Sequence, residues 1–322
     1  MRVDAKRGTE DTKAMNAMHA RISVVVLTHN RLSEVTRTVE RLLALPEHPR
    51  VVVVDNGSSD GTVHALRQRF AGVHVVALGA NLGAAGRNHG VAAAETDYVA
   101  FSDDDTHWAP GSLEHAVRVL DAAPRVAVLS GRVLVGERHC VDPTCLRMST
   151  SPLPRDGLPG PALVGYMAGA CVFRTAVFRE VGGYEPRLFI GGEESLVSLD
   201  VLDRGYAIVY CDAVTVVHHP SPARDARLRR LMLARNAAVV AWMRLPAAQA
   251  VVASGRALAV YARDAKRTLA RDTFMLMADI AWAWRRRRVV ASNVLAMRRQ
   301  VSAAERAAAR RSSTPAAAEP DR

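Results

Sequence analysis

The first half of the chain alternates between continuous apolar runs and segments with helical spacing. The apolar runs are rich in valine and predict strands that are covered on both faces, at 22–27, 51–54, 73–78, 98–101 and 126–129. The segments between them carry apolar residues every three or four positions and predict helices, at 31–45, 62–70, 83–94 and 112–122. This order predicts an α/β fold with a mostly parallel sheet and helices on both faces.

The pattern changes after the fifth predicted strand. Residues 131–161 are rich in proline, glycine and polar side chains, and we expect them to form an irregular excursion over the ligand-binding edge of the sheet. Regular structure then resumes in short strands and helices, at 169–173, 175–181, 193–204, 207–210 and 214–219.

Composition divides the chain into four parts. We expect a flexible leader at 1–20, the α/β domain at 21–222 and a disordered tail at 311–322. Between the last two, residues 223–310 carry alanine, arginine, leucine and methionine at helical spacing. This stretch predicts a basic helical appendage.

Three consecutive carboxylates, Asp103, Asp104 and Asp105, directly follow an apolar strand. Like charges repel each other, and a stable strand end does not require them. A bound divalent cation such as Mg²⁺ or Mn²⁺ would explain the three carboxylates, because carboxylates and substrate phosphates are its preferred ligands. In an extended backbone, Asp103 and Asp105 leave on the same side and can converge on one metal–nucleotide complex. The alternative interpretation is a solvated acidic turn.

Two further polar clusters, at 28–30 and 55–60, also follow predicted strands. Parallel strands gather their carboxyl ends at one edge of the sheet, where ligands of such folds bind. We therefore expect these clusters and the acidic triplet to form one site. The first strand lacks a glycine-rich turn and the chain lacks a Walker A lysine motif, which argues against an NAD enzyme and a P-loop enzyme.

The chain has 322 residues and a formal net charge of +11, which favours anionic partners. We expect no nucleic-acid partner, because neither zinc-finger spacing nor an aromatic and basic stacking surface is present. The four cysteines lack C-x-x-C spacing, which is typical of free thiols in a reducing compartment. The sequence shows no secretory h-region and no run of ~18 apolar residues. We expect a cytoplasmic protein, either soluble or peripheral on the inner face of the cell membrane.

Several motifs follow each other in a specific order. They are Val24–Arg31, Val54–Thr62, Asn81–Gly90, Ser102–Asp105, Gly169–Arg174, Val181–Tyr184, Gly192–Glu194 and His218–His219. Together they resemble the inverting glycosyltransferases of family 2, which have a GT-A fold, over residues 21–220. The resemblance implies a Rossmann-like mixed sheet, a nucleoside-diphosphate-sugar donor bound across the first half of the chain, and a divalent cation.

The resemblance also implies residues that bind the donor nucleotide. Thr28 and Asn30 would lie along the nucleoside, and Asp55 would bond its base or ribose. Arg87 would meet a diphosphate oxygen. Two other interpretations stay open, namely that Asp55 only caps the next helix and that Arg87 is a surface arginine of a helix.

For the metal and the sugar, the resemblance implies the acidic triplet and a histidine. Asp103 would face the ribose or the metal, Asp104 the donor sugar and Asp105 the metal. His218 would complete the metal shell, although the choice between His218 and His219 stays open. A pair of histidines at a strand end without a ligand role is the alternative.

Inverting transfer needs a base that takes the proton of the acceptor hydroxyl while this hydroxyl attacks from the far side of the sugar. The pair Glu193-Glu194 can supply it. The family usually carries Glu-Asp there with the second carboxylate as base, so we favour Glu194 and keep Glu193 as the other candidate. An acidic pair that only complements a helix dipole is the alternative.

The predicted appendage contains bulky apolar residues next to four arginines. The apolar residues are Phe274, Met275, Leu276, Met277, Ile280, Trp282 and Trp284, and the arginines are 285–288. A helix that lies in an anionic membrane interface has this composition, and so does a helix packed on its own protein with a solvated basic end. Membrane contact would suit a lipid-linked acceptor.

The sequence thus predicts a metal-dependent inverting glycosyltransferase. It would use a UDP or dTDP sugar, with GDP still open, and a glycan or lipid-linked acceptor, in cell-envelope or other glycan synthesis. A sugar nucleotidyltransferase of the same fold is less well supported, because residues 28–31 do not resemble its glycine-rich basic loop. A non-catalytic nucleotide-sugar-binding protein or membrane scaffold is the alternative from another class.

Overall fold

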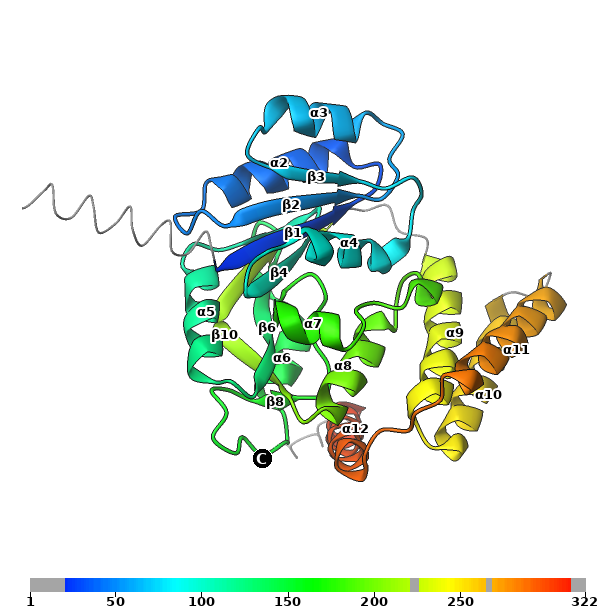
Figure 1. The fold of residues 1–322 in the computed structure, drawn as a ribbon. Coiled ribbons are helices and arrows are strands. Elements are labelled where there is room, and N and C mark those ends of the chain that lie inside the picture. The colour runs from blue at the N-terminus through cyan, green and yellow to red at the C-terminus, as the bar shows by residue number, and fades with distance from the viewer. Residues whose placement is uncertain (1–20, 221–225, 265–267, 314–322) are drawn as a thin grey trace, which may run out of the picture.

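A curled mixed sheet forms the centre of the molecule (Figure 1). The structure is a computed structural model that describes residues 21–220, 226–264 and 268–313. Among these residues, one sheet of ten strands runs in the order β3-β2-β1-β4-β9-β6-β10-β5, with β7 beside β6 and β8 beside β10. Helices cover both faces of this sheet, as the α/β pattern predicts.

The first half of the sheet is parallel, as predicted. Its strands are β3 (His74–Ala77), β2 (Arg50–Asp55), β1 (Ile22–Thr28) and β4 (Tyr98–Asp103). The helical elements between them are α2 (Leu32–Leu43), α3 (Thr62–Arg69), the 3₁₀ turn η1 (Gly83–Ala85) and α4 (Gly86–Ala93). The valines of β1 and β2 are buried, which explains their continuous apolar pattern.

The second half of the sheet is mixed, as the resemblance to family 2 implies, so the expectation of mostly parallel strands from the apolar pattern does not extend to it. Strand β9 (Cys171–Arg174) lies antiparallel between β4 and β6 (Val126–Val135), and β5 (Thr106–Trp108) is antiparallel to β10 (Ala207–His218). A strand in the middle of a covered sheet is apolar on both faces in either direction. The sequence pattern of β9 therefore could not reveal its orientation.

The segment 131–161 is more regular than expected. Strand β6 continues to Val135, β7 (Cys140–Val141) pairs with it, and α6 (Pro143–Ser149) follows. Pro143 occupies the first turn of α6, where its missing N–H costs nothing, and Asp142 caps the helix by accepting from Thr144 N at 2.7 Å. The polar composition here reflects caps and turns between regular elements.

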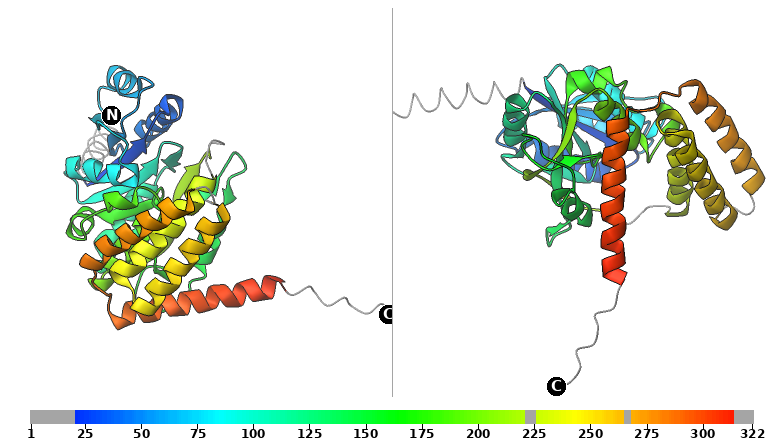
Figure 2. Two further views of the ribbon diagram at one scale, coloured as in Figure 1. Left: turned by 90° about the vertical axis from the view of Figure 1, so that its right-hand side faces the viewer. Right: turned by 90° about the horizontal axis from the view of Figure 1, so that it is seen from below.

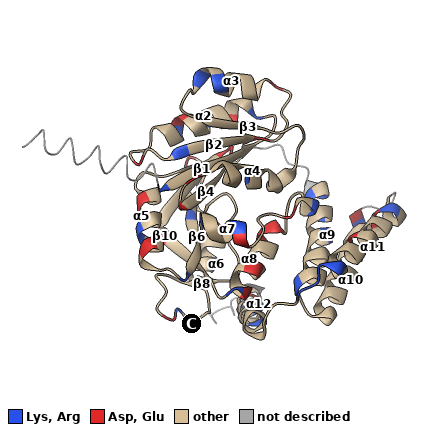
Figure 3. Ribbon diagram, viewed as in Figure 1, with Lys and Arg blue, Asp and Glu red and all other residues tan. Residues whose placement is uncertain are grey.

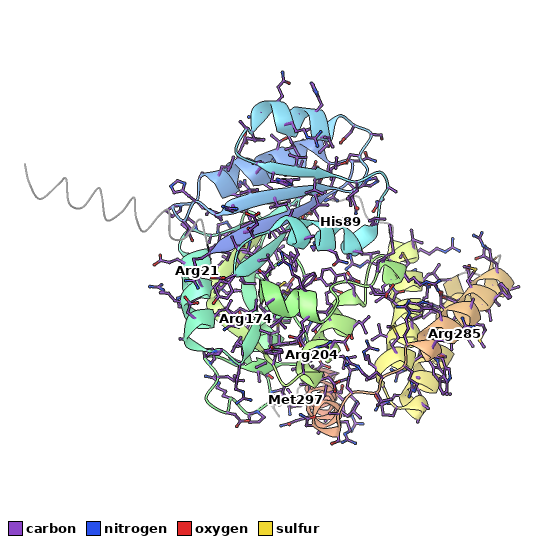
Figure 4. All side chains as sticks on the ribbon, in the orientation of Figure 1. Arg21, His89, Arg174, Arg204, Arg285 and Met297 are labelled. Atoms are coloured by element: carbon purple, nitrogen blue, oxygen red, sulfur yellow. The ribbon has the colours of Figure 1, made fainter. Side chains whose placement is uncertain are left out.

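The remaining elements of the α/β domain are short. They are α5 (Ser112–Ala122), β8 (Ala162–Leu163), α7 (Thr175–Glu180), the 3₁₀ turn η2 (Pro186–Leu188) and α8 (Glu193–Asp203). The two extended segments predicted at 207–210 and 214–219 form the single strand β10, whose register shifts between Cys211 and Thr215. Arg174, labelled in Figure 4, ties β9 to the neighbouring elements by donating to Val126 O at 2.8 Å and Ala123 O at 3.1 Å.

Aromatic side chains form the centre of the core beneath β4 and β9. Phe101 packs edge-on against Phe178 at 5.3 Å between ring centroids and lies 5.7 Å from Phe173. Tyr166 and Tyr184 complete the cluster, joined by a hydrogen bond of 3.2 Å between their hydroxyl groups. This packing holds the end of β4, and with it the start of the acidic triplet.

Among the described residues, four helices follow the sheet domain: α9 (Ala226–Arg244), α10 (Ala247–Asp264), α11 (Leu269–Arg285) and α12 (Ser292–Ser313). Helices α9, α10 and α11 pack side by side, and α12 runs apart from them (Figure 2). The predicted leader at 1–20 and residues 314–322 of the predicted tail lie outside the described residues, whereas 311–313 belong to α12. In the part of the chain that the structure describes, no helix has the length and apolar character needed to cross a membrane.

Candidate active site

A pocket of about 470 Å³ opens at the carboxyl ends of β1 and β4. The N-terminus of α8 and the first turns of α9 form its other walls. The pocket brings together seven of the residues that the sequence singles out: Thr28, Arg87, Asp103, Asp104, Asp105, Glu193 and Glu194. Residues 131–161, all of them described, contribute nothing to its lining, so the predicted excursion over the site is wrong.

Asp104 is turned toward the first strand. Its carboxylate accepts from Thr28 Oγ1 at 3.0 Å and from Arg31 Nη1 at 2.8 Å, and its backbone oxygen accepts from Thr38 Oγ1 at 2.8 Å. Burial raises the pKa of Asp104 to about 6, against the opposing effect of the Arg31 guanidinium. Asp103 instead forms an ion pair with the buried Arg87. The acidic triplet is therefore compensated by two arginines.

Sequence reasoning gave Arg31 no role of its own. In the structure its guanidinium reaches both Asp104, at 2.8 Å, and Asp105, at 3.3 Å. The available signal was its position directly after Thr28-His29-Asn30, at the carboxyl end of the first strand.

Asp105 and His218 face each other across the end of β10. Asp105 Oδ1 lies 3.5 Å from His218 Nε2, and the two side chains are 1% and 21% exposed. This separation is long for a hydrogen bond but near the spacing of roughly 3 Å between neighbouring ligands on a six-coordinate cation. No group of three or more His, Cys, Asp and Glu side chains in the described ranges has the arrangement of a complete metal site. The pair fits a cation whose other ligands come from substrate phosphates and water.

Asn30, Asp55 and His218 are not among the residues that line the pocket. Asn30 adopts a left-handed conformation with φ of 52°, which asparagine tolerates, and its Oδ1 accepts from Ser59 N at 2.7 Å. Asp55 is buried at the end of β2, where Oδ2 accepts from Ser58 N at 2.9 Å. Its Oδ1 has no hydrogen-bond partner among the described residues. Both residues shape the loop after β2, and Asp55 keeps one buried acceptor without a hydrogen-bond partner among the described residues.

Glu193 and Glu194 open α8 directly after Gly192, whose φ of 98° turns the chain into the helix. Glu193 is 4% exposed, and its Oε2 lacks a hydrogen-bond partner within the described residues. Burial raises the pKa of Glu193 to about 7, and the negative charge of Glu194 adds to this shift. Both residues line the pocket. A carboxylate that titrates near neutral pH is suited to proton transfer.

The family model for glycosyl transferase family 2 matches residues 23–182, which contain the acidic triplet and most of the parallel half of the sheet. The chain belongs to glycosyl transferase family 2. The curated relatives include N-acetylglucosaminyl-diphospho-decaprenol L-rhamnosyltransferase of Mycobacterium tuberculosis. It is 28% identical over 252 residues, which cover 63% of this chain and 78% of the relative. The enzyme class, a glycosyltransferase, follows from these matches.

Solved structures with a GT-A fold resemble this family 2 glycosyltransferase. S. aureus TarS 1-349 in complex with UDP-GlcNAc aligns with a TM-score of 0.55 at 17% identity, covering 86% of this chain and 83% of that one. The chain covers 39% of a longer TarS chain. The mannosyltransferase PcManGT from Pyrobaculum calidifontis, in complex with GDP-Man and Mn²⁺, aligns with a TM-score of 0.53 at 19% identity, covering 92% and 76%. These likenesses confirm the predicted GT-A fold.

One wall of the pocket in this glycosyltransferase comes from residues that sequence reasoning missed. Helix α9 contributes Leu228, Arg229, Met232 and Leu233, and the loop 189–191 lies beside them. Leu228 and Met232 are four residues apart and therefore lie on one face of α9. The sequence shows this spacing but does not reveal which distant element the face meets.

Proposed function

We propose that the chain transfers a sugar from a nucleoside diphosphate to an acceptor hydroxyl with inversion at the anomeric carbon. One observation carries this proposal, namely that the acidic triplet at the end of β4 and the glutamate pair at the start of α8 line the same pocket. An inverting displacement requires the leaving diphosphate and the base on opposite sides of the sugar. The two clusters approach the pocket from different elements, which supports this division of roles.

The donor nucleotide would bind along the ends of β1, β2 and β4. We assign this role to Thr28, Asn30, Asp55, Arg87, Asp103 and Asp104. The spare Oδ1 of the buried Asp55 supports a hydrogen bond to a base or ribose donor. Buried Arg87 offers its positive charge to a diphosphate. We favour a UDP or dTDP sugar, while GDP stays in the test because PcManGT was solved with GDP-Man.

Asp105, His218 and Asp103 would hold Mg²⁺ or Mn²⁺. The facing pair of Asp105 and His218 supports this assignment, as does the Mn²⁺ in PcManGT. A bound cation would offset the negative charge of the departing diphosphate.

Glu194 is our candidate for the base that takes the proton of the acceptor hydroxyl, and Glu193 would be its partner. The buried, neutral-range carboxyl of Glu193 beside Glu194 supports a pair that keeps one proton at about pH 7. Their position at the start of α8 also lets the helix N-terminus stabilise negative charge.

The acceptor would approach between α9 and the loop 189–191. Leu228, Leu233 and Ile190 make this wall largely apolar, and Arg229 adds a positive charge. Such a wall suits an amphiphilic acceptor, either a glycan on a lipid diphosphate or another glycan, in cell-envelope or related glycan synthesis. The M. tuberculosis relative is named for a diphospho-decaprenol acceptor, which supports the same class.

A thermal-shift panel tests the donor site. UDP, dTDP and GDP are each added with and without Mn²⁺, and we expect one nucleotide to raise Tm by about 5 °C in a metal-dependent way. Ligands that bind only the folded state stabilise it by mass action. Well-folded protein that responds to none of the three would contradict the donor site and favour the scaffold alternative.

We also propose that the helical layer α9–α11 contacts the cytoplasmic face of an anionic membrane. Phe274 and Met277 on α11 are 72% and 57% exposed, and long stretches of α10 and α11 carry no charge (Figure 3). Arg285, labelled in Figure 4, and Arg286 remain exposed beside this face. Apolar side chains next to arginines are the composition of an interfacial helix.

Three of the four arginines have structural partners, and the guanidinium of Arg286 lies 4.8 Å from the centroid of the Trp282 ring. Arg287 donates to the backbone oxygens of Trp242 and Leu245, and Arg288 forms an ion pair with Asp200 at 2.9 Å. Only part of the basic run is therefore available to lipid headgroups.

Vesicle sedimentation tests the membrane proposal. We expect the protein to bind vesicles with 30% phosphatidylglycerol at low salt, at roughly tenfold higher affinity than the variant Phe274→Ser/Met277→Ser, because the variant loses two exposed apolar side chains that would insert into the membrane interface. The matched control Ala262→Ser changes an exposed position of α10 and should bind as the wild type does. Equal partitioning of wild type and double variant would contradict this surface.

A further inference from the structure

The loop that leads into α8 is held by one buried side chain of α9. Asn236 is 0% exposed, and its Nδ2 donates to Leu188 O at 2.7 Å, to Ile190 O at 3.1 Å and to Gly191 O. These carbonyl groups lie just before Glu193. A single amide therefore bonds three of the backbone carbonyl groups that precede the glutamate pair.

The loop adopts a conformation that needs such support. Phe189 has φ of 57°, in the left-handed region that is unfavourable for a bulky side chain. On its other side, Phe189 O accepts from Ala84 N at 2.6 Å, and any side chain at Gly83 would overlap Phe189 O. Strained conformations of this kind persist only where the surroundings fix them. The loop thus spans the pocket between η1, on the donor side, and α9.

The orientation of the Asn236 amide is also fixed. Arg235 Nη1 donates to Asn236 Oδ1 at 2.8 Å and to Arg187 O at 2.9 Å. Arg235 Nε in turn donates to Asp279 of α11 at 2.7 Å. With its oxygen bonded to Arg235, the amide can only present its nitrogen to the loop.

Helix α9 is anchored to α8 at a second point. Arg244, at the C-terminus of α9, binds both carboxylate oxygens of Asp200 in α8. Asn236 and Arg244 lie two turns of helix apart, so α9 is fixed at two points, to the loop before α8 and to α8 itself. The close approach is visible at Gly192, where an added Cβ would lie 3.1 Å from the Cβ of Asn236.

From this geometry we propose that Asn236 is a positioning residue for the transfer reaction, because its amide holds the loop 188–191 so that α8 presents Glu193 and Glu194 to the pocket. The inference rests on the proposed function of the glutamate pair and adds a residue of the C-terminal helices to the catalytic machinery. It also predicts that the helices after residue 222 are required for turnover.

The test compares Asn236→Ala with Val239→Ala, a buried residue of the same helix that contacts the core. The probe is the release of nucleoside diphosphate from UDP-GlcNAc, dTDP-rhamnose or GDP-mannose with water as acceptor, using the donor that stabilises the protein most. Asn236→Ala should lower kcat about 100-fold, as small misplacements of catalytic groups do, while the KM for donor changes less than about threefold. Val239→Ala should lower Tm about as much as Asn236→Ala does, but it should keep kcat within about twofold of the wild-type value.

A second variant covers the case in which Asn236→Ala does not fold. Arg235→Gln leaves Asn236 in place but removes the group that orients its amide, and we expect kcat to fall about tenfold with an unchanged KM for donor. Wild-type kcat in Asn236→Ala or in folded Arg235→Gln would overturn the positioning role while Glu194→Gln remains inactive. Wild-type activity in Glu194→Gln would instead overturn the proposed base, and the inference with it.

Discussion

Replacing Glu194 with glutamine is expected to lower turnover about 10³-fold while nucleoside diphosphate binding stays unchanged. The substitution keeps the shape of the side chain and removes the carboxylate that would accept the proton of the acceptor hydroxyl. Turnover is measured as release of nucleoside diphosphate, and binding as the thermal shift with Mn²⁺.

Glu193→Gln is the matched comparison, one residue earlier in the same helical turn. It removes the carboxyl whose pKa burial raises to about 7, and we expect a smaller loss, about tenfold, because Glu194 keeps its charge. A larger loss in Glu193→Gln than in Glu194→Gln would reverse the two roles. Wild-type turnover in both variants would exclude the pair as the source of the base.

The second large effect is expected for Asp105→Ala. Turnover should fall at least about 100-fold, because the cation that offsets the leaving diphosphate loses a ligand. The part of the nucleotide thermal shift that depends on Mn²⁺ should disappear, while the shift without metal remains. Both quantities come from the same panel of nucleotides and metal.

Two histidine variants separate a metal role from a local disturbance of the strand end. His218→Ala should reproduce the loss of metal dependence, since His218 Nε2 faces Asp105 Oδ1 at 3.5 Å. His219→Ala should keep it, because the His219 ring stacks on His107 with 5.6 Å between centroids. Metal dependence that survives in both Asp105→Ala and His218→Ala would contradict this assignment.

The parallel half of the sheet could be predicted from the sequence because its information is local. Val24, Val52 and Phe101 lie in short apolar runs, and each run ends in polar residues at the same edge of a parallel sheet. The rule that ligands bind at this edge then suffices to place Thr28 and Asp105 in one pocket.

The pocket wall formed by α9 and the loop 189–191 could not be predicted in the same way, because its contacts join segments far apart in the chain. Asn236 is a polar residue in an alanine-rich helix, and its sequence neighbours do not indicate the three carbonyl groups that it binds. The direction of β9 could not be predicted for a related reason. A strand that is buried on both faces has no alternation of apolar and polar residues, so its sequence does not indicate which strands lie beside it. The donor that a carbonyl group binds, and the strand that lies beside another strand, are determined only when the chain has folded.

The position of Asn236 late in the chain also determines the order in which parts of the nascent chain can fold during synthesis. A nascent chain that has released residues up to 220 can already pair β1 with β4 and β6 with β10, yet the carbonyl groups before α8 still lack their amide donor. At a synthesis rate of about 5–20 residues per second, α9 leaves the ribosome only seconds later. If Asn236 acts as proposed, the ribosome-bound chain forms the parallel half of its sheet first and becomes able to transfer sugar only after α9 has emerged.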